Sequence, residues 1–287
     1  MSVDILQEKI RRTKNPSIME LAMKLGDLPP GFSADAAGYG GYCRELLEGL
    51  KAIVPAVRVS FSAFALLGAE GMNQLSETLT AAGKLGYYVA LDAPELLSPM
   101  MAELVADALF GEESRYPCDG VVIGGYLGSD VIKPFLPYCK KADKDLFVVA
   151  RTANRSAPEL QDLLSGARLV HAAAADHVNR HSLGTVGKLG YSRVGVLAAA
   201  SSADSLRNLR AKYPQLFLLV DGVDYPNANA KNCSNAFDKY GHGAVVSGSA
   251  IVNAWKRAGS DGSDYLAHAV AAAERMKKNL TRYVTVL

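Results

Sequence analysis

Eight short apolar runs, separated by amphipathic segments, place the strongest constraint on how this chain can fold. The strand-like runs are Ser17–Leu21, Ala56–Ser60, Tyr87–Leu91, Gly120–Ile123, Leu146–Ala150, Val194–Leu197, Leu216–Val220 and Ala244–Ser247. The helical segments are Gly40–Ile53, Ala69–Leu85, Met100–Phe110, Asp130–Lys141, Ser202–Tyr213, Asn229–Tyr240 and Asp264–Asn279. Strands that alternate with helices predict a parallel sheet with right-handed crossovers. Eight such units without a linker between them favour one (β/α)₈ barrel domain over residues 1–287.

The composition is that of an ordinary globular protein. Hydrophobic residues make up 49% of the chain and charged residues 21%, and the net charge is only +2. The basic residues are scattered, which argues against a nucleic-acid-binding surface. No apolar run approaches the roughly 20 residues of a membrane span, and the first residues lack the pattern of a secretory signal. Reduced thiols in a cytoplasmic location are expected because four cysteines lie far apart: Cys43, Cys118, Cys139 and Cys233.

Polar side chains follow many of the predicted strands. In a barrel these positions share one mouth, where ligands bind. The candidate ligand-binding residues are Glu20, Arg58, Ser60, Asp92, Tyr126, Arg151, Thr152, Asn154, Asp221, Asp224, Ser247 and Ser249. The set contains both positive and negative charges, so it predicts where a site lies but not which reaction or ligand the site serves. The glycine-containing turns are too short for a dinucleotide fingerprint, so we expect no dinucleotide cofactor.

Asp92 ends the third apolar run, and Pro94 breaks the strand directly afterwards. A strand that delivers a carboxylate at its carboxyl end is how α/β folds place active-site groups. The alternative is that Asp92 only caps the following loop. Ser98 and Pro99 predict the N-cap and the first turn of the next helix.

Four stretches together resemble the longer bacterial form of the orotidine 5′-monophosphate decarboxylase family, over nearly the whole chain. Residues 56–71 are similar to the family's second strand and the start of the next helix. Residues 126–134 are similar to its segment after strand four, residues 151–163 to its Thr-Ser-Asn loop and Leu-Gln-Asp continuation, and residues 241–249 to its strand eight. The resemblance implies a (β/α)₈ barrel that decarboxylates its nucleotide without a cofactor, and a two-fold homodimer with sites near the interface.

The family's catalytic signature is incomplete in this chain. The family carries Asp-x-Lys-x-x-Asp after strand three, and its lysine protonates the carbon from which carbon dioxide leaves. Here Asp92 remains, but the lysine position is Pro94 and the second aspartate position is Leu97. Neither side chain can hold a proton. A rescue would require Lys84 or Lys24 to reach within hydrogen-bond distance of the reacting carbon.

The phosphate-binding site that the resemblance implies is also altered. The family's aspartate after strand one corresponds to Glu20, and its lysine after strand two to Arg58, which keeps the charge with another geometry. Its glycine-rich phosphate loop has become residues 220–226, where Asp221 and Asp224 would repel a phosphate. The family's arginine after strand eight is missing, since the next one is Arg257. The nearby cationic candidates are Lys231 and His242.

Two further groups of residues allow alternative interpretations. His177 and His181 share a helix face at i and i+4, which suits zinc, but such pairs more often lie on a solvated helix. Arg151 and Arg155 can bind an anion. They can equally pair with acidic residues of the next helical segment, Glu159 and Asp162.

Two hypotheses on function follow. The first is a catalytically degenerate homologue that binds a small molecule or a partner at the barrel mouth. The second is an active decarboxylase of pyrimidine biosynthesis that makes uridine 5′-monophosphate. A changed reaction at an acidic mouth formed by Asp92, Glu95, Asp221 and Asp224, holding a cation or an amine, remains a further alternative.

Overall fold

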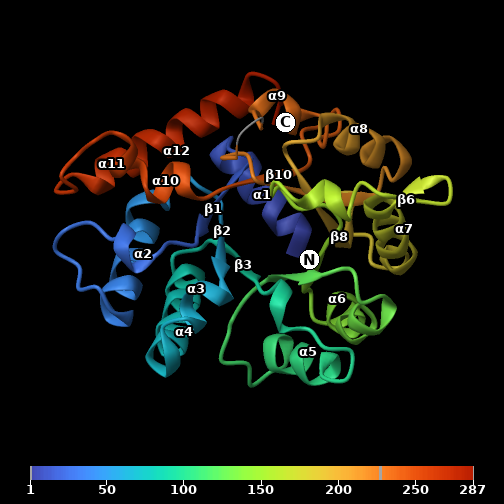
Figure 1. The fold of residues 1–287 in the computed structure, drawn as a ribbon, viewed down its shortest axis with the longest axis horizontal. Helices are drawn as coiled ribbons and strands as arrows, with labels where there is room; N and C mark the ends of the chain where they lie inside the picture. The colour runs from blue at the N-terminus through green and yellow to red at the C-terminus, as the bar shows by residue number, and fades with distance from the viewer. Residues whose placement is uncertain (1, 226–227, 287) are drawn as a thin grey trace.

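The computed structural model describes residues 2–225 and 228–286, and its centre is a closed barrel of eight parallel strands (Figure 1). The barrel strands are β1 (Ser17–Leu21), β2 (Ala56–Ser60), β3 (Tyr88–Asp92), β4 (Gly120–Gly124), β5 (Asp145–Val149), β8 (Ser192–Ala199), β9 (Leu216–Asp221) and β10 (Ala244–Ser247). Each pairs with its neighbours along the chain, and β1 closes the barrel by pairing with both β2 and β10. The predicted (β/α)₈ barrel is confirmed, and every strand overlaps its predicted run.

The strands form where the sequence is continuously apolar because both faces of each strand are covered. All five residues of β2 and all five of β5 are buried. On β8, Gly195 makes room for two large rings, since a Cβ at this position would lie 3.2 Å from the ring of Phe147 and 2.7 Å from the carbonyl oxygen of Phe217. The ring centroids of Phe147 and Phe217 are 5.8 Å apart. The core therefore fills the barrel and leaves its carboxyl end for the polar residues.

The helices surround the strands (Figure 1). They are α2 (Ala36–Leu50), α3 (Phe61–Ala65), α4 (Gly68–Lys84), α5 (Ala102–Phe110), α6 (Leu136–Lys141), α7 (Val170–Ser182), α8 (Ala203–Lys212), α9 (Ala230–Ser234), α10 (Ser249–Val252), α11 (Ala254–Arg257) and α12 (Tyr265–Thr281). None of the helices in the described part of the chain is both long and apolar enough to cross a membrane.

Three helix predictions are wrong in detail. The stretch predicted as one helix over residues 130–141 instead forms two 3₁₀ turns, η3 (Ser129–Val131) and η4 (Lys133–Phe135), before α6, because Pro134 cannot donate to an α-helical ladder. The helix predicted to reach Tyr240 ends at Ser234, where the side-chain Nδ2 of Asn235 donates to the carbonyls of Lys231 and Asn232. Ser98 is not an N-cap. The helix after β3 begins at Ala102, and Met101 precedes it without a side-chain capping bond.

An amino-terminal helix, α1 (Ser2–Thr13), was not predicted. It lies across the amino-terminal end of the barrel, where Gln7 donates to the carbonyl of Gly243, directly before β10. Its apolar side chains Val3, Leu6 and Ile10 are buried. The Asp4 carboxylate accepts from the amides of Lys188 and Leu189 in the loop before β8. The helix therefore closes the end of the barrel opposite the mouth.

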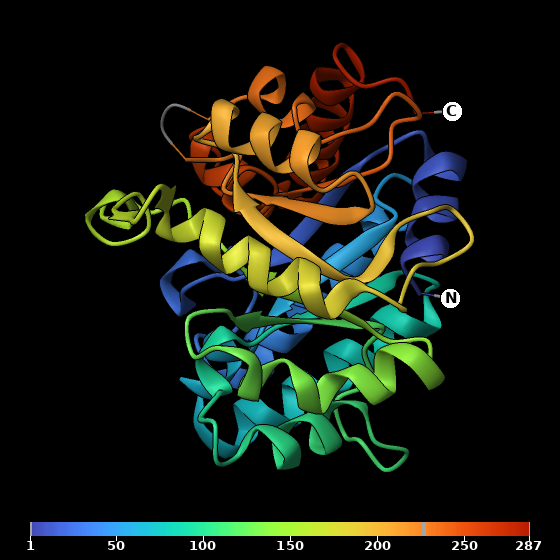
Figure 2. The same cartoon turned by 90° about the vertical axis from the view of Figure 1, so that its right-hand side faces the viewer.

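A small antiparallel hairpin, β6 (Leu164–Ser165) and β7 (Arg168–Leu169), lies between β5 and α7. It projects from the body of the barrel (Figure 2). Gly166 takes a positive φ of 65° in its turn, a conformation that favours glycine. The hairpin leads directly into α7 and so sets where that helix begins.

Candidate functional site at the barrel mouth

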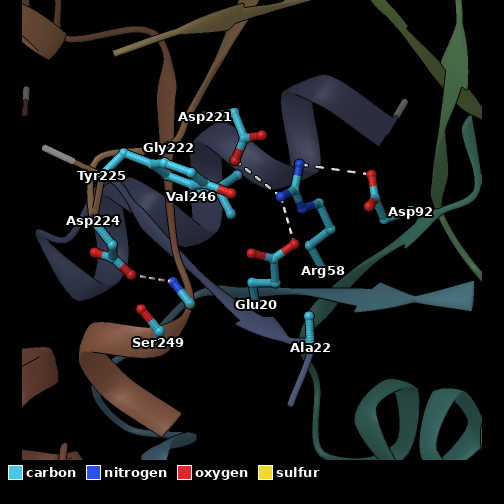
Figure 3. A pocket seen from close by; sticks show the side chains of 11 residues that line it. Glu20, Ala22, Arg58, Asp92, Asp221, Gly222, Asp224, Tyr225, Val246 and Ser249 are labelled. Carbon is cyan, nitrogen blue, oxygen red and sulfur yellow. Dashed lines mark hydrogen bonds and ion pairs between the residues drawn. The ribbon is translucent and has the colours of Figure 1, made fainter. Parts of the chain in front are cut away.

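The carboxyl ends of β1, β2, β3, β9 and β10 surround a pocket of about 490 Å³ (Figure 3). Its lining residues are Glu20, Ala22, Arg58, Asp92, Asp221, Gly222, Asp224, Tyr225, Val246, Gly248 and Ser249. Six of the predicted residues therefore meet in one place: Glu20, Arg58, Asp92, Asp221, Asp224 and Ser249. Pro226, the last residue of the altered phosphate loop, lies outside the described residues.

Arg58 occupies the centre of this pocket, and its side chain is only 4% exposed. Its Nη2 donates to Glu20 Oε1 at 2.5 Å and to Asp221 Oδ1 at 2.9 Å. Its Nη1 lies 3.6 Å from Asp92 Oδ1. A buried guanidinium is tolerated only when it is paired, and these three carboxylates supply the partners (Figure 3). Arg58 belongs to β2, so its contacts connect this strand to β1, β3 and β9.

The burial of this cluster changes the proton affinity of its members. Burial raises the pKa of Glu20 to about 7, although Arg58 opposes the shift. Burial also raises the pKa of Asp92, again against the effect of Arg58. For Arg58 burial acts in the opposite sense, but the surrounding carboxylates outweigh it and raise its pKa well above the ordinary value. Glu20 can therefore exchange a proton near neutral pH, whereas Arg58 stays charged.

Asp224 occupies the corner of the pocket after β10. Its Oδ2 accepts from the amides of Gly248 at 2.8 Å and Ala250 at 3.0 Å. Its Oδ1 accepts from the hydroxyl of Ser247 at 2.9 Å. Backbone amides at the start of a helix are a common place for a bound anion. Here a carboxylate of the chain itself takes that place, so an anionic ligand would have to displace it.

One cation that was not among the predicted site residues lies close to this corner. Arg257, at the end of α11, donates from Nη2 to the hydroxyl of Ser249 at 2.8 Å. The expected role of His242 is wrong, because it precedes β10 at the opposite end of the barrel, where its Nε2 lies 2.9 Å from Arg11 Nη2. Lys231 lines a different pocket, between α9 and α12.

Comparison with known proteins adds a decisive observation. An orotidine 5′-phosphate decarboxylase of Rhodopirellula baltica is 31% identical to this chain over 227 residues, which cover 77% of this chain and 75% of that protein. The chain belongs to the orotidine 5′-phosphate decarboxylase family. The corresponding enzyme of Clostridium novyi is 26% identical over 216 residues, 75% of this chain and 74% of that protein.

Solved structures show the same fold. The orotidine 5′-monophosphate decarboxylase of Leishmania donovani superimposes with a TM-score of 0.78 at 24% identity, covering 99% of this chain and 98% of that one. The Leishmania donovani UMP synthase gives a TM-score of 0.80 at 24% identity, covering 98% of this chain and 56% of that one. A scan against protein-family models finds no match.

In this member of the decarboxylase family, the segment after β3 carries no lysine. Pro94 begins a 3₁₀ turn, η2 (Pro94–Leu96), and Leu97 packs half-buried against the core. Lys84 cannot replace the missing side chain, because it lines a separate pocket with Pro117 and Cys118. Among the described residues that line the mouth pocket, Arg58 is the only cation.

The remaining predicted residues do not line this pocket. The hydroxyl of Ser60 accepts from the amide of Ala63 and caps α3. Arg151 makes a two-bond ion pair with Asp162, so its pairing alternative is the one observed. The others are bonded within the protein. Tyr126 donates to the Ala150 carbonyl, Thr152 bonds to Asn154 and Gln161, and Ser247 donates to Asp224.

The histidine pair on α7 does not gather metal ligands. His181 Nε2 lies 3.0 Å from Ser129 Oγ, and His177 Nδ1 lies 3.5 Å from the same oxygen. Within residues 2–225 and 228–286, no group of three or more histidine, cysteine or acidic side chains is arranged to hold a metal ion. All four cysteines are buried and free, as expected of reduced thiols.

Proposed function

We propose that this protein is a catalytically degenerate member of its family, which binds a small ligand at the barrel mouth and does not decarboxylate orotidine 5′-monophosphate. The observation that carries the proposal is the absence of a proton donor where the family has its lysine. Pro94 stands at that position, and the single cation of the described pocket lining is Arg58. A guanidinium whose pKa is raised above its ordinary value cannot deliver a proton at neutral pH.

Loss of the second acid supports the same proposal. In the family, charged groups set in advance around the lysine stabilise the transition state. Leu97 at the second aspartate position carries no charge, and Asp92 is engaged at 3.6 Å by Arg58. The remaining acids, Glu20 and Asp221, are bound to the same guanidinium and do not form an alternating acid–lysine network.

Purified protein incubated with orotidine 5′-monophosphate tests this directly, by following the loss of substrate absorbance. We expect a rate equal to that of buffer alone. A turnover rate typical of enzymes, above about 1 s⁻¹, that Asp92→Asn abolishes would establish an active decarboxylase instead. Glu274→Ala, which removes an exposed charge on α12, is the matched control for Asp92→Asn.

The ligand that suits the mouth pocket carries positive charge. Besides the three carboxyl groups around Arg58, the pocket contains the Asp224 carboxylate, so acidic groups outnumber basic ones. Glu20, with a pKa near 7, can act as general acid or base toward an amine, which is the basis for a changed reaction as the second candidate. A thermal-shift screen of primary amines and of nucleotides, run on wild type and on Glu20→Gln, separates these two ligand classes. We expect primary amines to stabilise wild type. Stabilisation by nucleotides but not by amines would contradict this choice.

The protein is further proposed to form a homodimer through the rim of the mouth. Leu66 after α3 and Met100 before α5 are 86% and 91% exposed, and both follow the carboxyl ends of barrel strands. Leu104 on α5 adds a third exposed apolar side chain. A contiguous exposed apolar patch marks a protein interface, and the proposal is that these three side chains contribute to one such patch. Light scattering should give twice the monomer mass for wild type and the monomer mass for Met100→Lys with Leu104→Lys. A monomeric wild type would contradict the proposal.

A further inference from the structure

A serine, a histidine and an aspartate come together outside the barrel mouth, between α7 and α8. Ser205 Oγ lies 3.1 Å from His171 Nε2, and His171 Nδ1 lies 3.1 Å from Asp162 Oδ1. The three residues come from different segments: the loop after β5, the start of α7 and the start of α8. The two helices lie beside each other at the edge of the barrel (Figures 1 and 2). None of the three residues lines the mouth pocket.

The tautomer of His171 follows from its partners. Nδ1 faces two groups that can only accept, the Asp162 carboxylate and the Gln161 carbonyl oxygen at 3.0 Å. The proton of a neutral imidazole must therefore sit on Nδ1. Nε2 then carries the lone pair, and the Ser205 hydroxyl donates to it. This is the orientation in which an imidazole removes the proton of a serine nucleophile.

The aspartate is held ionised and in place. Arg151 donates to both oxygens of Asp162, from Nε at 2.9 Å and from Nη2 at 2.8 Å. These bonds hold the pKa of Asp162 below its ordinary value. The backbone amide of His171 also donates to the Gln161 carbonyl, at 2.9 Å. The histidine is thus fixed through both its backbone and its ring.

The three side chains line a pocket of about 320 Å³ that is separate from the mouth. Its apolar wall is formed by Leu169, Ala172, Leu209 and Tyr213. Ser205 is the third residue of α8, a helix of ten residues, and the amides of a first turn have no acceptor inside their own helix. Those amides and the helix dipole are suited to stabilise a negative oxygen that forms next to the serine.

We propose that Ser205, His171 and Asp162 form a second, hydrolytic site that cleaves carboxylic esters with a short apolar acyl group. Ser205 Oγ forms a bond to the ester carbonyl carbon as its proton passes to His171 Nε2. The tetrahedral intermediate then expels the alkoxide, which takes that proton and leaves as the alcohol. Water attacks the acyl-serine, and its proton passes through His171 back to Ser205 Oγ. The products are the carboxylic acid and the alcohol, so no oxidant or cofactor is required.

Covalent labelling of the full-length protein tests the nucleophile without requiring a variant. A fluorophosphonate probe should add once per chain, and peptide mass spectrometry should locate it on Ser205. Labelling should be absent in Ser205→Ala and at least 100-fold slower in His171→Gln. No addition at Ser205 under conditions that fully label an authentic serine hydrolase would overturn the proposal. So would labelling at the same rate in His171→Gln.

Hydrolysis of p-nitrophenyl acetate and butyrate provides a second readout. We expect catalysed release of p-nitrophenol by wild type, its loss in Ser205→Ala, and partial retention in Ser205→Cys, which keeps a nucleophile at the same position. Ser234→Ala is the matched control, because this half-buried α9 side chain lines neither pocket and donates to the Lys231 carbonyl at 2.8 Å. If Ser205→Ala lowers the melting temperature but leaves the rate unchanged, the serine only ties α7 to α8 and the proposal fails. Asp92→Asn, at the barrel mouth, should leave the esterase rate intact.

Discussion

Replacing Asp224 with alanine is expected to strengthen phosphate binding at the barrel mouth and to lower the stability of the protein. The Asp224 carboxylate accepts three hydrogen bonds, from the amide of Gly248 at 2.8 Å, the amide of Ala250 at 3.0 Å and the hydroxyl of Ser247 at 2.9 Å. In the alanine variant these three donors become free for another anion. Wild type should bind uridine 5′-monophosphate only in the high micromolar to millimolar range.

The size of both effects can be worked from this geometry. Loss of a carboxylate that caps helix amides costs about 1–2 kcal/mol of unfolding free energy. A phosphate that approaches within about 4 Å of a carboxylate is repelled by about 1 kcal/mol per pair of unit charges in water, and by about 4 kcal/mol near a protein surface. If Asp224→Ala removes about 1.4 kcal/mol or more of this repulsion, the dissociation constant for the phosphate should fall at least tenfold.

Isothermal titration calorimetry with uridine 5′-monophosphate and with inorganic phosphate measures the effect. Asp224→Asn keeps an oxygen acceptor without the charge and should show an intermediate gain. Glu274→Ala removes an exposed charge on α12 and should leave affinity unchanged. A low-micromolar dissociation constant for wild type would refute the reasoning. An unchanged constant in a folded Asp224→Ala variant would refute it equally.

Three further changes should have defined effects on stability, each measured by urea unfolding. Arg58→Met leaves three carboxyl groups without their buried partner and should cost about 3–5 kcal/mol, whereas the exposed control Arg207→Met should cost less than about 0.5 kcal/mol. Glu20 binds its proton more tightly in the folded state, so the free energy of unfolding should fall as pH rises from about 4.5 to 7. With a folded-state pKa of about 7, discounted for a side chain that is 20% exposed, this loss amounts to about 2 kcal/mol. Glu20→Gln, which cannot titrate, should make the unfolding free energy depend less on pH over this range. Leu6→Ala should cost about 2–5 kcal/mol by opening a cavity under α1, and the partly exposed Ile5→Ala distinctly less.

The barrel could be predicted from sequence because its strands are buried on both faces, which leaves continuous apolar runs that local reading detects. The mouth residues Glu20, Arg58, Asp92 and Asp221 could be predicted together for a related reason, since parallel strands all end at one face. Arg151 and Thr152 also follow a barrel strand but do not line the pocket, because the side chains of Asp162 and Gln161 bind them.

Other features depend on contacts that sequence spacing does not reveal. Arg257 returns to the mouth only because two short helices, α10 and α11, turn the chain after β10. Ser205 and His171 are 34 residues apart, and no motif joins them. The sequence of the amino-terminal segment does not predict that α1 covers the barrel, because the position of α1 depends on the loops that it contacts.

The closure of the barrel by α1 and by the pairing of β1 with β10 has a consequence during synthesis. Both contacts join segments that are far apart along the chain, since Ser17 of β1 pairs with Val245 of β10. At about 5–20 residues per second, the ribosome reaches β10 roughly 10–50 s after it has released β1. Throughout that interval the edge of β1 that pairs with β10 has no native partner, and α1 lacks its contact with Gly243. The nascent chain therefore presents a binding site for chaperones, and its yield in cells should depend on them more strongly than its final stability suggests.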